Sequence, residues 1–260
     1  MAPMPALFVS HGAPTLAIED GPAHRFLAAY GAMFGRAKAV LAISAHWETA
    51  APAVTSAESP ATIHDFYGFP RALYRIRYPA PGDPALADRV AGRLEQAGLP
   101  TTADDQRGLD HGAWVPLSLM FPDADVPVVQ LSIQTALGPQ HHYRLGAALA
   151  PLRDDGVLIM GSGGMTHNLG EFHGRRVDEP PPGWVVDFAE WTAAALADGR
   201  IDDLLDYRDR APHAARNHPT DEHFLPLFAA IGAAGPAARV QRVHASHSYG
   251  VLAMDAFAFS

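Results

Sequence analysis

The sequence contains no cysteine, and this absence removes several kinds of chemistry at once. Disulfides, zinc–thiolate sites, iron–sulfur clusters and a cysteine nucleophile are all excluded. A metal ion bound by this chain must therefore use histidine, aspartate, glutamate or water as its ligands.

Long apolar runs are also missing, and so is an excess of positive charge. No stretch approaches the ~20 uninterrupted apolar residues of a membrane-spanning helix, and no charged segment followed by an apolar core indicates a signal peptide. The 19 lysines and arginines are outnumbered by 28 acidic residues, which gives a formal charge of −9. We therefore expect a cytoplasmic protein that binds neither nucleic acid nor a membrane.

Histidine, in contrast, is abundant, with 14 in 260 residues. Three short apolar runs lead directly to His11, His46 and His167. Bounded apolar runs of this length are typical of buried strands, and their alternation with helical segments indicates a parallel sheet. Because ligands bind at the carboxyl ends of such strands, we expect these histidines to meet at one edge of the sheet and form a metal site.

The pattern predicts one α/β domain over residues 1–260, with a central, mostly parallel twisted sheet flanked by helices. Strands are expected at Ala6–Ser10, Ala39–Ser44, Val126–Ile133, Val157–Gly161 and Ser248–Ala258, and helices at Pro84–Ala97, Ala113–Met120, Gln140–Arg153, Trp184–Ala197 and Thr220–Gly232.

The helix expected at Thr220–Gly232 carries a further candidate ligand. Thr220 is the predicted N-cap, which places His223 in the first turn, facing the edge where loops gather. Glu222 lies about 100° around the helix from His223, so we expect only one of the two to reach the ion.

Other histidines are assigned to substrate or to the surface. His111 opens a predicted helix, whose N-terminus favours a neutral imidazole and a hydrogen bond to substrate. His64, Tyr67 and Phe69 belong to an aromatic loop that is either the wall of a pocket for a planar ligand or a packed surface loop, and His247 is a weaker pocket candidate. We expect His218 to be solvated and the following histidines to lie on the surface: His24, His141, His142, His173 and His213.

Glycines before His167 allow a close approach of backbone to a ligand. A phosphate-binding loop would use glycines in the same way, but the lysine of a P-loop and the spacing of a dinucleotide fingerprint are missing. Arg71, Arg75 and Arg107 are candidates to bind a substrate carboxylate, although solvated surface positions are the simpler interpretation.

Several motifs, in the same order, resemble those of the class III extradiol ring-cleavage dioxygenases, and most closely the single-chain DOPA 4,5-dioxygenase branch of plants and bacteria. The resemblance runs from about residue 5 to about residue 255. The motifs are His11-Gly-Ala-Pro, Ser44-Ala-His-Trp, His64-Asp-Phe-Tyr-Gly-Phe-Pro, Tyr78-Pro-Ala-Pro-Gly, Asp110-His-Gly-Ala-Trp, Pro127-Val-Val-Gln-Leu-Ser-Ile, Thr166-His-Asn-Leu and Thr220-Asp-Glu-His-Phe-Leu-Pro-Leu.

This resemblance implies a mononuclear metal site in an α/β fold. His11 and His46 match two ligands of the family, and His223 matches the third ligand of this branch, where the protocatechuate-cleaving relatives have a glutamate. The family uses Fe(II), and a set of three histidines makes zinc occupancy of the purified protein an expectation too. His167 matches the acid/base histidine and is also a candidate fourth ligand.

The activity implied by the resemblance is the insertion of O2 into a DOPA-like or other substituted catechol to give a muconic semialdehyde. His167 would act as base and then acid, His111 would bind substrate or oxygen, and Tyr67 and Phe69 would pack on the ring. Two alternatives stay open: a zinc-dependent hydrolase of a small amide or ester, and a non-enzymatic interaction protein on the same fold. The substituent of the catechol and homo-oligomerisation are also open.

Overall fold

The computed structural model describes residues 3–35 and 37–260, and its centre is a sheet of eight strands in which the four inner ones run parallel. This arrangement confirms the predicted α/β class. At both edges the sheet includes antiparallel pairs. In spatial order the strands are β4 (Thr102–Asp104), β3 (Ala53–Thr55), β5 (Val128–Ile133), β2 (Ala39–Glu48), β6 (Val157–Gly163), β1 (Ala6–Ser10), β10 (Ala256–Phe259) and β7 (Val240–His244).

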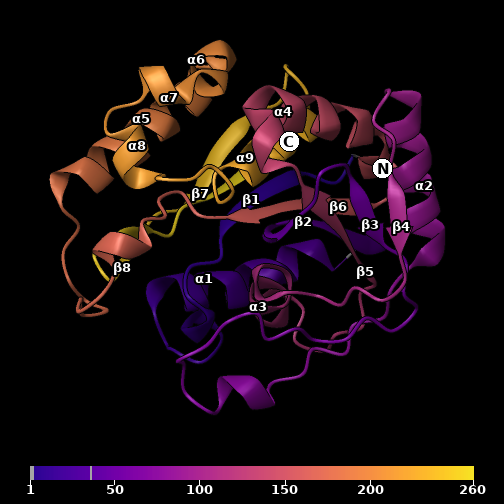
Figure 1. Cartoon of the computed structure of the whole chain (residues 1–260), viewed down its shortest axis with the longest axis horizontal. Helices are drawn as coiled ribbons and strands as arrows, with labels where there is room; N and C mark the ends of the chain where they lie inside the picture. Colours follow the sequence, from indigo (N-terminus) through magenta and orange to yellow (C-terminus); the bar gives the residue numbers. More distant parts are fainter. Residues whose placement is uncertain (1–2, 36) are drawn as a thin grey trace.

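Helices cover both faces of this sheet (Figure 1). On one face α9 (Leu225–Ala234) packs on β6 and β1 and against α4 (Gly138–Leu149), and on the other α3 (His111–Met120) packs on β2 beside α1 (Pro22–Tyr30). α2 (Pro84–Gln96) lies against β3 and β4. Four further helices gather beyond one end of the sheet: α5 (Gly183–Ala197), α6 (Ile201–Leu205), α7 (Tyr207–Arg210) and α8 (Ala214–Asn217).

Shorter elements complete the chain. β8 (His247–Ser248) and β9 (Leu252–Ala253) form a separate antiparallel pair. The 3-10 helices are η1 (Pro14–Ala17), η2 (Gly31–Phe34), η3 (Leu73–Arg75), η4 (Thr135–Leu137), η5 (Ala150–Arg153) and η6 (Leu169–Glu171). Among the described residues, none of the helices combines the length and the apolar composition needed to cross a membrane.

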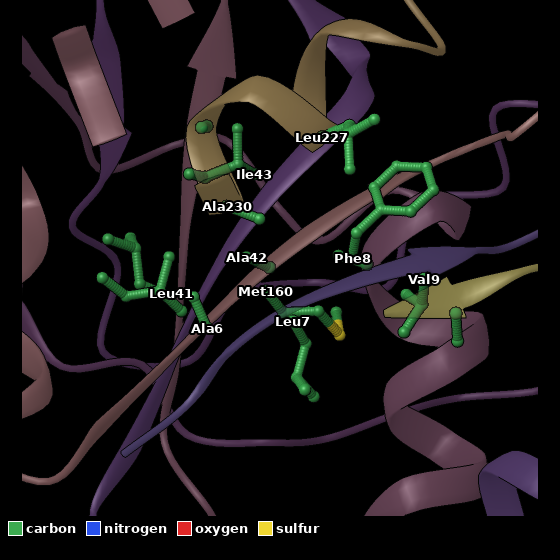
Figure 2. Packing of buried hydrophobic residues seen from close by; sticks show 14 of the residues in the cluster. Ala6, Leu7, Phe8, Val9, Leu41, Ala42, Ile43, Met160, Leu227 and Ala230 are labelled. Atoms are coloured by element: carbon green, nitrogen blue, oxygen red, sulfur yellow. The ribbon is translucent and has the colours of Figure 1, made fainter. Parts of the chain in front are cut away.

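The core lies on both sides of the parallel strands, which explains their nearly continuous apolar sequences. Figure 2 shows Phe8 on the side of Leu227 and Ala230 from α9, with Leu7 on the opposite side of the same strand. Alternate residues of a strand point to opposite faces, and here both faces are buried. Burial of a side chain of this size contributes about 1.5–3 kcal/mol, so the strands that lead to the histidines are held firmly.

Two predictions about elements are wrong in detail. The expected helix Thr220–Gly232 begins only at Leu225, with Pro226 in its first turn, where a proline costs no backbone hydrogen bond. His223 therefore lies in the turn before α9. The single strand expected at Ser248–Ala258 is divided into β8, β9 and β10, and a turn in which Tyr249 and Gly250 have positive φ separates the first two.

Candidate metal centre

Three histidines from distant parts of the sequence converge at the carboxyl edge of the sheet. His11 directly follows β1, and His46 lies within β2, which continues four residues beyond the predicted end. β6 lies between these two strands. His223 reaches the same edge from the turn before α9, where its carbonyl accepts a hydrogen bond from Gly164 N–H at 2.8 Å.

Glycines of β6 make this approach of the third histidine possible. A Cβ built on Gly163 would lie 2.1 Å from the carbonyl oxygen of His223, and one on Gly161 would lie 2.2 Å from that of Pro226. Both distances are far below a normal contact, so larger residues would push the His223 turn away from the sheet. The glycines at these two positions therefore allow the backbone of the His223 turn to approach β6, whereas the sequence predicted an approach of the backbone to a ligand.

The Nε2 atoms of the three histidines face one another. His46 Nε2 lies 3.0 Å from His11 Nε2 and 3.2 Å from His223 Nε2. A zinc-like ion with bonds of about 2.0–2.1 Å and tetrahedral angles holds its nitrogens about 3.3 Å apart. The spacing of these atoms therefore fits three ligands of a single ion.

The opposite nitrogen of each ring faces an oxygen atom. His11 Nδ1 lies 3.0 Å from Ser162 Oγ, His223 Nδ1 lies 3.1 Å from Glu222 Oε1, and His46 Nδ1 lies 3.5 Å from Asp65 Oδ2. The Ser162 hydroxyl donates to the Gly112 carbonyl, so it accepts from His11. A proton fixed on Nδ1 leaves a lone pair on Nε2, which is the form that binds a metal.

Burial keeps these imidazoles neutral. It lowers the pKa of His11, His46 and His223 well below the usual value for histidine, and neighbouring histidines lower it further. The three rings are therefore neutral at pH 7, and with the proton of each ring on Nδ1 their three Nε2 lone pairs face one another without a hydrogen-bond donor. A cation bound between the three Nε2 atoms would accept all three lone pairs, so this set of ligands fits the metal that the sequence predicts.

His111 lies next to this cluster at the first position of α3. Its ring centroid is 3.9 Å from that of His46. Asp110, the N-cap of α3, accepts from Ala113 N–H at 3.2 Å and so fixes the start of the helix. His111 Nδ1 donates to Asp65 Oδ1 at 2.9 Å, which leaves its Nε2 free for other partners.

Asp65 was not predicted as a site residue. Burial raises its pKa, but hydrogen bonds and charge from His111 outweigh this effect and lower the pKa to about 2. The carboxylate is thus ionised at pH 7 and lies between His111 and His46. Its position beside the predicted His64 was the only signal in the sequence.

His167 lies just beyond β6, with its ring stacked on His223 at 3.4 Å and an interplanar angle of 9°. Its backbone N–H donates to the Asn217 carbonyl at 2.9 Å. Burial lowers the pKa of His167 to about 4 although Glu222, 4.0 Å from Nδ1, raises it. The ring is therefore neutral at pH 7 and able to accept a proton.

The histidine cluster lies at the wall of a cavity of about 550 Å³. Its lining includes four histidines and four aromatic residues: His46, His111, His167, His223, Phe66, Tyr67, Phe69 and Phe172. Tyr67 is 92% exposed and lies at the rim. The described lining includes no lysine or arginine. The volume of the cavity is sufficient for a planar aromatic molecule.

Other predicted residues are placed elsewhere. The His64 ring lies among Phe66, Tyr74 and Trp114, and its Nε2 donates to the Ile76 carbonyl at 3.1 Å, outside the residues that line the cavity. His247 lines a second cavity of about 470 Å³. The structure thus does not bring these two side chains to the histidine cluster.

Two predicted surface positions are wrong. His142 and His218 are fully buried. His142 Nε2 accepts from Gln134 N–H and His218 Nε2 donates to the Met165 carbonyl, so both rings hold backbone segments. Arg107, a candidate for a substrate carboxylate, instead donates to the His46 carbonyl and to Asp110.

Comparison with known proteins gives consistent results. The family model for the catalytic LigB subunit of aromatic ring-opening dioxygenase matches residues 5–257. A protein named 4,5-DOPA dioxygenase extradiol from Beta vulgaris is 44% identical over 257 residues, 97% of this chain and 95% of that protein. A protein of the same name from Escherichia coli K12 is 43% identical over 236 residues, 88% of this chain and 85% of that protein.

A solved structure is similar over the whole chain as well. The crystal structure of an uncharacterized protein from Escherichia coli K12 matches with a TM-score of 0.83 and 36% sequence identity, and the match covers 99% of this chain and 100% of that one.

Proposed function

The chain belongs to the family of the catalytic LigB subunit of aromatic ring-opening dioxygenases, and from this premise we propose that it opens the ring of a DOPA-like catechol at the cluster of His11, His46 and His223. Enzymes of this family are metal-dependent oxidoreductases that cleave catechols in the extradiol manner with incorporation of O2. The class of reaction follows from the family. The catechol, the metal and the role of each residue are the proposal.

We assign the metal to the three Nε2 atoms of the cluster, and Fe(II) is the ion proposed for activity. Iron at this position would supply the one-electron chemistry that O2 needs in order to react with an organic molecule. The absence of a carboxylate ligand makes the set equally suitable for zinc, which we expect in protein purified without added iron.

His167 is proposed as the acid/base residue. Its ring lies beside the cluster and lines the cavity, and its lowered pKa, about 4, leaves it neutral at pH 7. In that form it accepts the proton of a catechol hydroxyl and returns it to an oxygen when the ring opens. Its role as a fourth ligand remains the alternative.

His111 and the aromatic wall are proposed to orient the substrate. Because Nδ1 of His111 is committed to Asp65, Nε2 is the ring nitrogen left to form a hydrogen bond with a hydroxyl group of the substrate. Phe66 and Phe69 offer flat apolar surface for the catechol ring and exclude water from the site. Tyr67, at the exposed rim, is placed to contact the substituent of the ring.

The observation that carries this proposal is the convergence of three neutral histidines beside a fourth one in an aromatic cavity. The test is product formation by protein reconstituted anaerobically with Fe(II) and then supplied with air and DOPA, protocatechuate or caffeate. A new yellow absorbance that is largest with DOPA supports the proposal. No product from any catechol, with iron bound, would refute it. The predicted cytoplasmic location stays a prediction.

A further inference from the structure

Two carboxylates lie beside the histidine cluster, and each is close to the Nδ1 atoms of two histidines. Asp65 lies between His46 and His111, with Oδ2 3.5 Å from His46 Nδ1 and Oδ1 2.9 Å from His111 Nδ1. Glu222 lies between His223 and His167, at 3.1 Å and 4.0 Å from their Nδ1 atoms. Each carboxylate therefore faces one histidine assigned to the metal and one assigned to the substrate.

We propose that Asp65 and Glu222 are positioning residues. Each accepts a hydrogen bond from Nδ1 of one histidine, His111 or His223, and places its charge beside Nδ1 of a second one, His46 or His167. This proposal rests on the proposed function for the roles of His111 and His167. It also makes metal binding and substrate chemistry depend on the same two side chains, neither of which is assigned as a ligand.

Both oxygen atoms of Asp65 are used. Oδ1 accepts from the backbone N–H of His111 at 3.0 Å as well as from its ring, and Oδ2 is left for His46. The backbone bond places a negative charge at the N-terminus of α3, which is a favourable position for it. The side chain of Asp65 is 21% exposed, so water can compete only in part for these contacts.

Glu222 uses a single oxygen for its contacts. Oε1 accepts from Thr220 Oγ at 3.0 Å and from His223 Nδ1 at 3.1 Å. The stacked rings of His167 and His223 present their Nδ1 atoms to this same oxygen. Oε1 of Glu222 therefore lies within 4.0 Å of the Nδ1 atoms of both rings.

This difference between the two carboxylates gives a specific expectation for amide variants. An asparagine at position 65 keeps one acceptor oxygen, and if it stays with His111 the amide N–H faces His46 Nδ1. That contact favours a proton on Nε2 of His46, which is the tautomer that does not bind a metal. A glutamine at position 222 can keep its oxygen where Oε1 lies, so only Glu222→Ala removes the contact.

The test is the zinc dissociation constant of the full-length metal-free protein, measured by competition with a chromophoric chelator. Loss of a group that orients a ligand typically weakens metal binding about 10–100-fold. We expect a loss of this size for Asp65→Asn and Glu222→Ala, and a change below about threefold for Glu222→Gln. The matched controls Asp105→Asn and Glu58→Gln, both exposed, should behave as wild type.

A second readout separates positioning from a general loss of structure. At saturating Fe(II), Glu222→Ala should lower kcat at least about tenfold with little change in KM, because His167 loses the carboxylate beside its Nδ1, whereas Glu222→Gln should restore most of kcat. If Asp65→Asn does not fold, the two Glu222 variants decide the question.

Zinc affinities within about twofold of wild type for both Asp65→Asn and Glu222→Ala would overturn the proposal. So would a loss in Glu222→Gln as large as in Glu222→Ala. The zinc measurement needs no turnover, so it remains decisive even if the wild-type protein consumes no oxygen and the proposed function fails.

Discussion

At the scale of single residues, the histidines that follow strands could be predicted and their partners could not. The apolar runs before His11 and His46 predict buried strands, and these strands place both histidines at the edge of the sheet. Ser162, which fixes the ring of His11, is 151 residues away in the chain. No local pattern links these two residues, because their contact depends on β1 and β6 being neighbours.

His167 gives the most direct prediction at this scale. Replacement by alanine removes the proposed base but leaves the three Nε2 atoms of the cluster in place. We expect oxygen uptake with DOPA to fall at least about 100-fold, as is typical for loss of a general acid or base, while the zinc dissociation constant changes less than about threefold. Unchanged turnover would remove His167 from the mechanism, and loss of metal binding would make it a ligand.

At the scale of elements, residue propensity and hydrophobic periodicity predict that a helix or strand exists better than they predict where it begins and ends. α2 was predicted to within one residue because Pro84 and Gly98 mark its ends. The start of α9 was misplaced, since Thr220 resembles an N-cap while the helix begins only at Leu225. The extension of β2 to Glu48 depends on its pairing with Ile133 of β5, a contact that the sequence does not show.

Glycine in two helices gives a matched prediction. A Cβ on Gly112 in α3 would lie 2.3 Å from Ser44 Oγ and 3.0 Å from His46 Cδ2, whereas Gly92 in α2 faces open space. Gly112→Ala should displace His46 and weaken zinc binding at least about tenfold. Gly92→Ala should leave zinc binding unchanged and raise the free energy of unfolding by about 0.5–1 kcal/mol. Equal zinc affinities in the two variants would contradict this packing.

The N-cap residues of α3 and α2 give a second pair of matched predictions. Asp110 is fully buried and accepts from Ser44 Oγ at 2.7 Å and from Arg107 at 3.2 Å, in addition to Ala113 N–H. Asp110→Ala should therefore lower the free energy of unfolding by about 3–5 kcal/mol. Asp83→Ala at α2 removes a single cap bond and should cost about 1 kcal/mol. Urea unfolding of the metal-free proteins compares them, and similar losses would argue against a buried network at Asp110.

At the scale of the whole molecule, the sheet brings together segments that are distant in the sequence. The cavity could not be predicted from the sequence for this reason. The strands that carry His11 and His46 meet only through β6, which lies more than a hundred residues further along the chain. The mostly parallel order was predictable from alternating apolar runs and helices. The antiparallel edges were not, because β10 joins β1 from the opposite end of the chain.

Buried histidines make the stability of the whole molecule depend on pH. Burial lowers the pKa of His142 to about 4 and of His218 to about 3, so between these values and about pH 6.5 the unfolded chain binds protons that the folded one does not. Stability is therefore lost as the pH falls through this window. Burial raises the pKa of Asp255 to about 6, which offsets part of the loss.

The net effect is measurable by urea unfolding of the metal-free protein. With about 1.4 kcal/mol for each unit of pKa difference, we expect the free energy of unfolding to be at least about 2 kcal/mol lower at pH 5 than at pH 7.5. Equal or greater stability at pH 5 would show that these histidines are not held neutral in the fold.

The most direct test of the central claim is oxygen uptake with DOPA by protein reconstituted anaerobically with Fe(II), beside the same protein loaded with zinc. The account predicts uptake of about one O2 per catechol consumed in the iron sample, and none in the zinc sample. Catechol left intact without oxygen uptake in the iron sample, with iron bound at His11, His46 and His223, would contradict it.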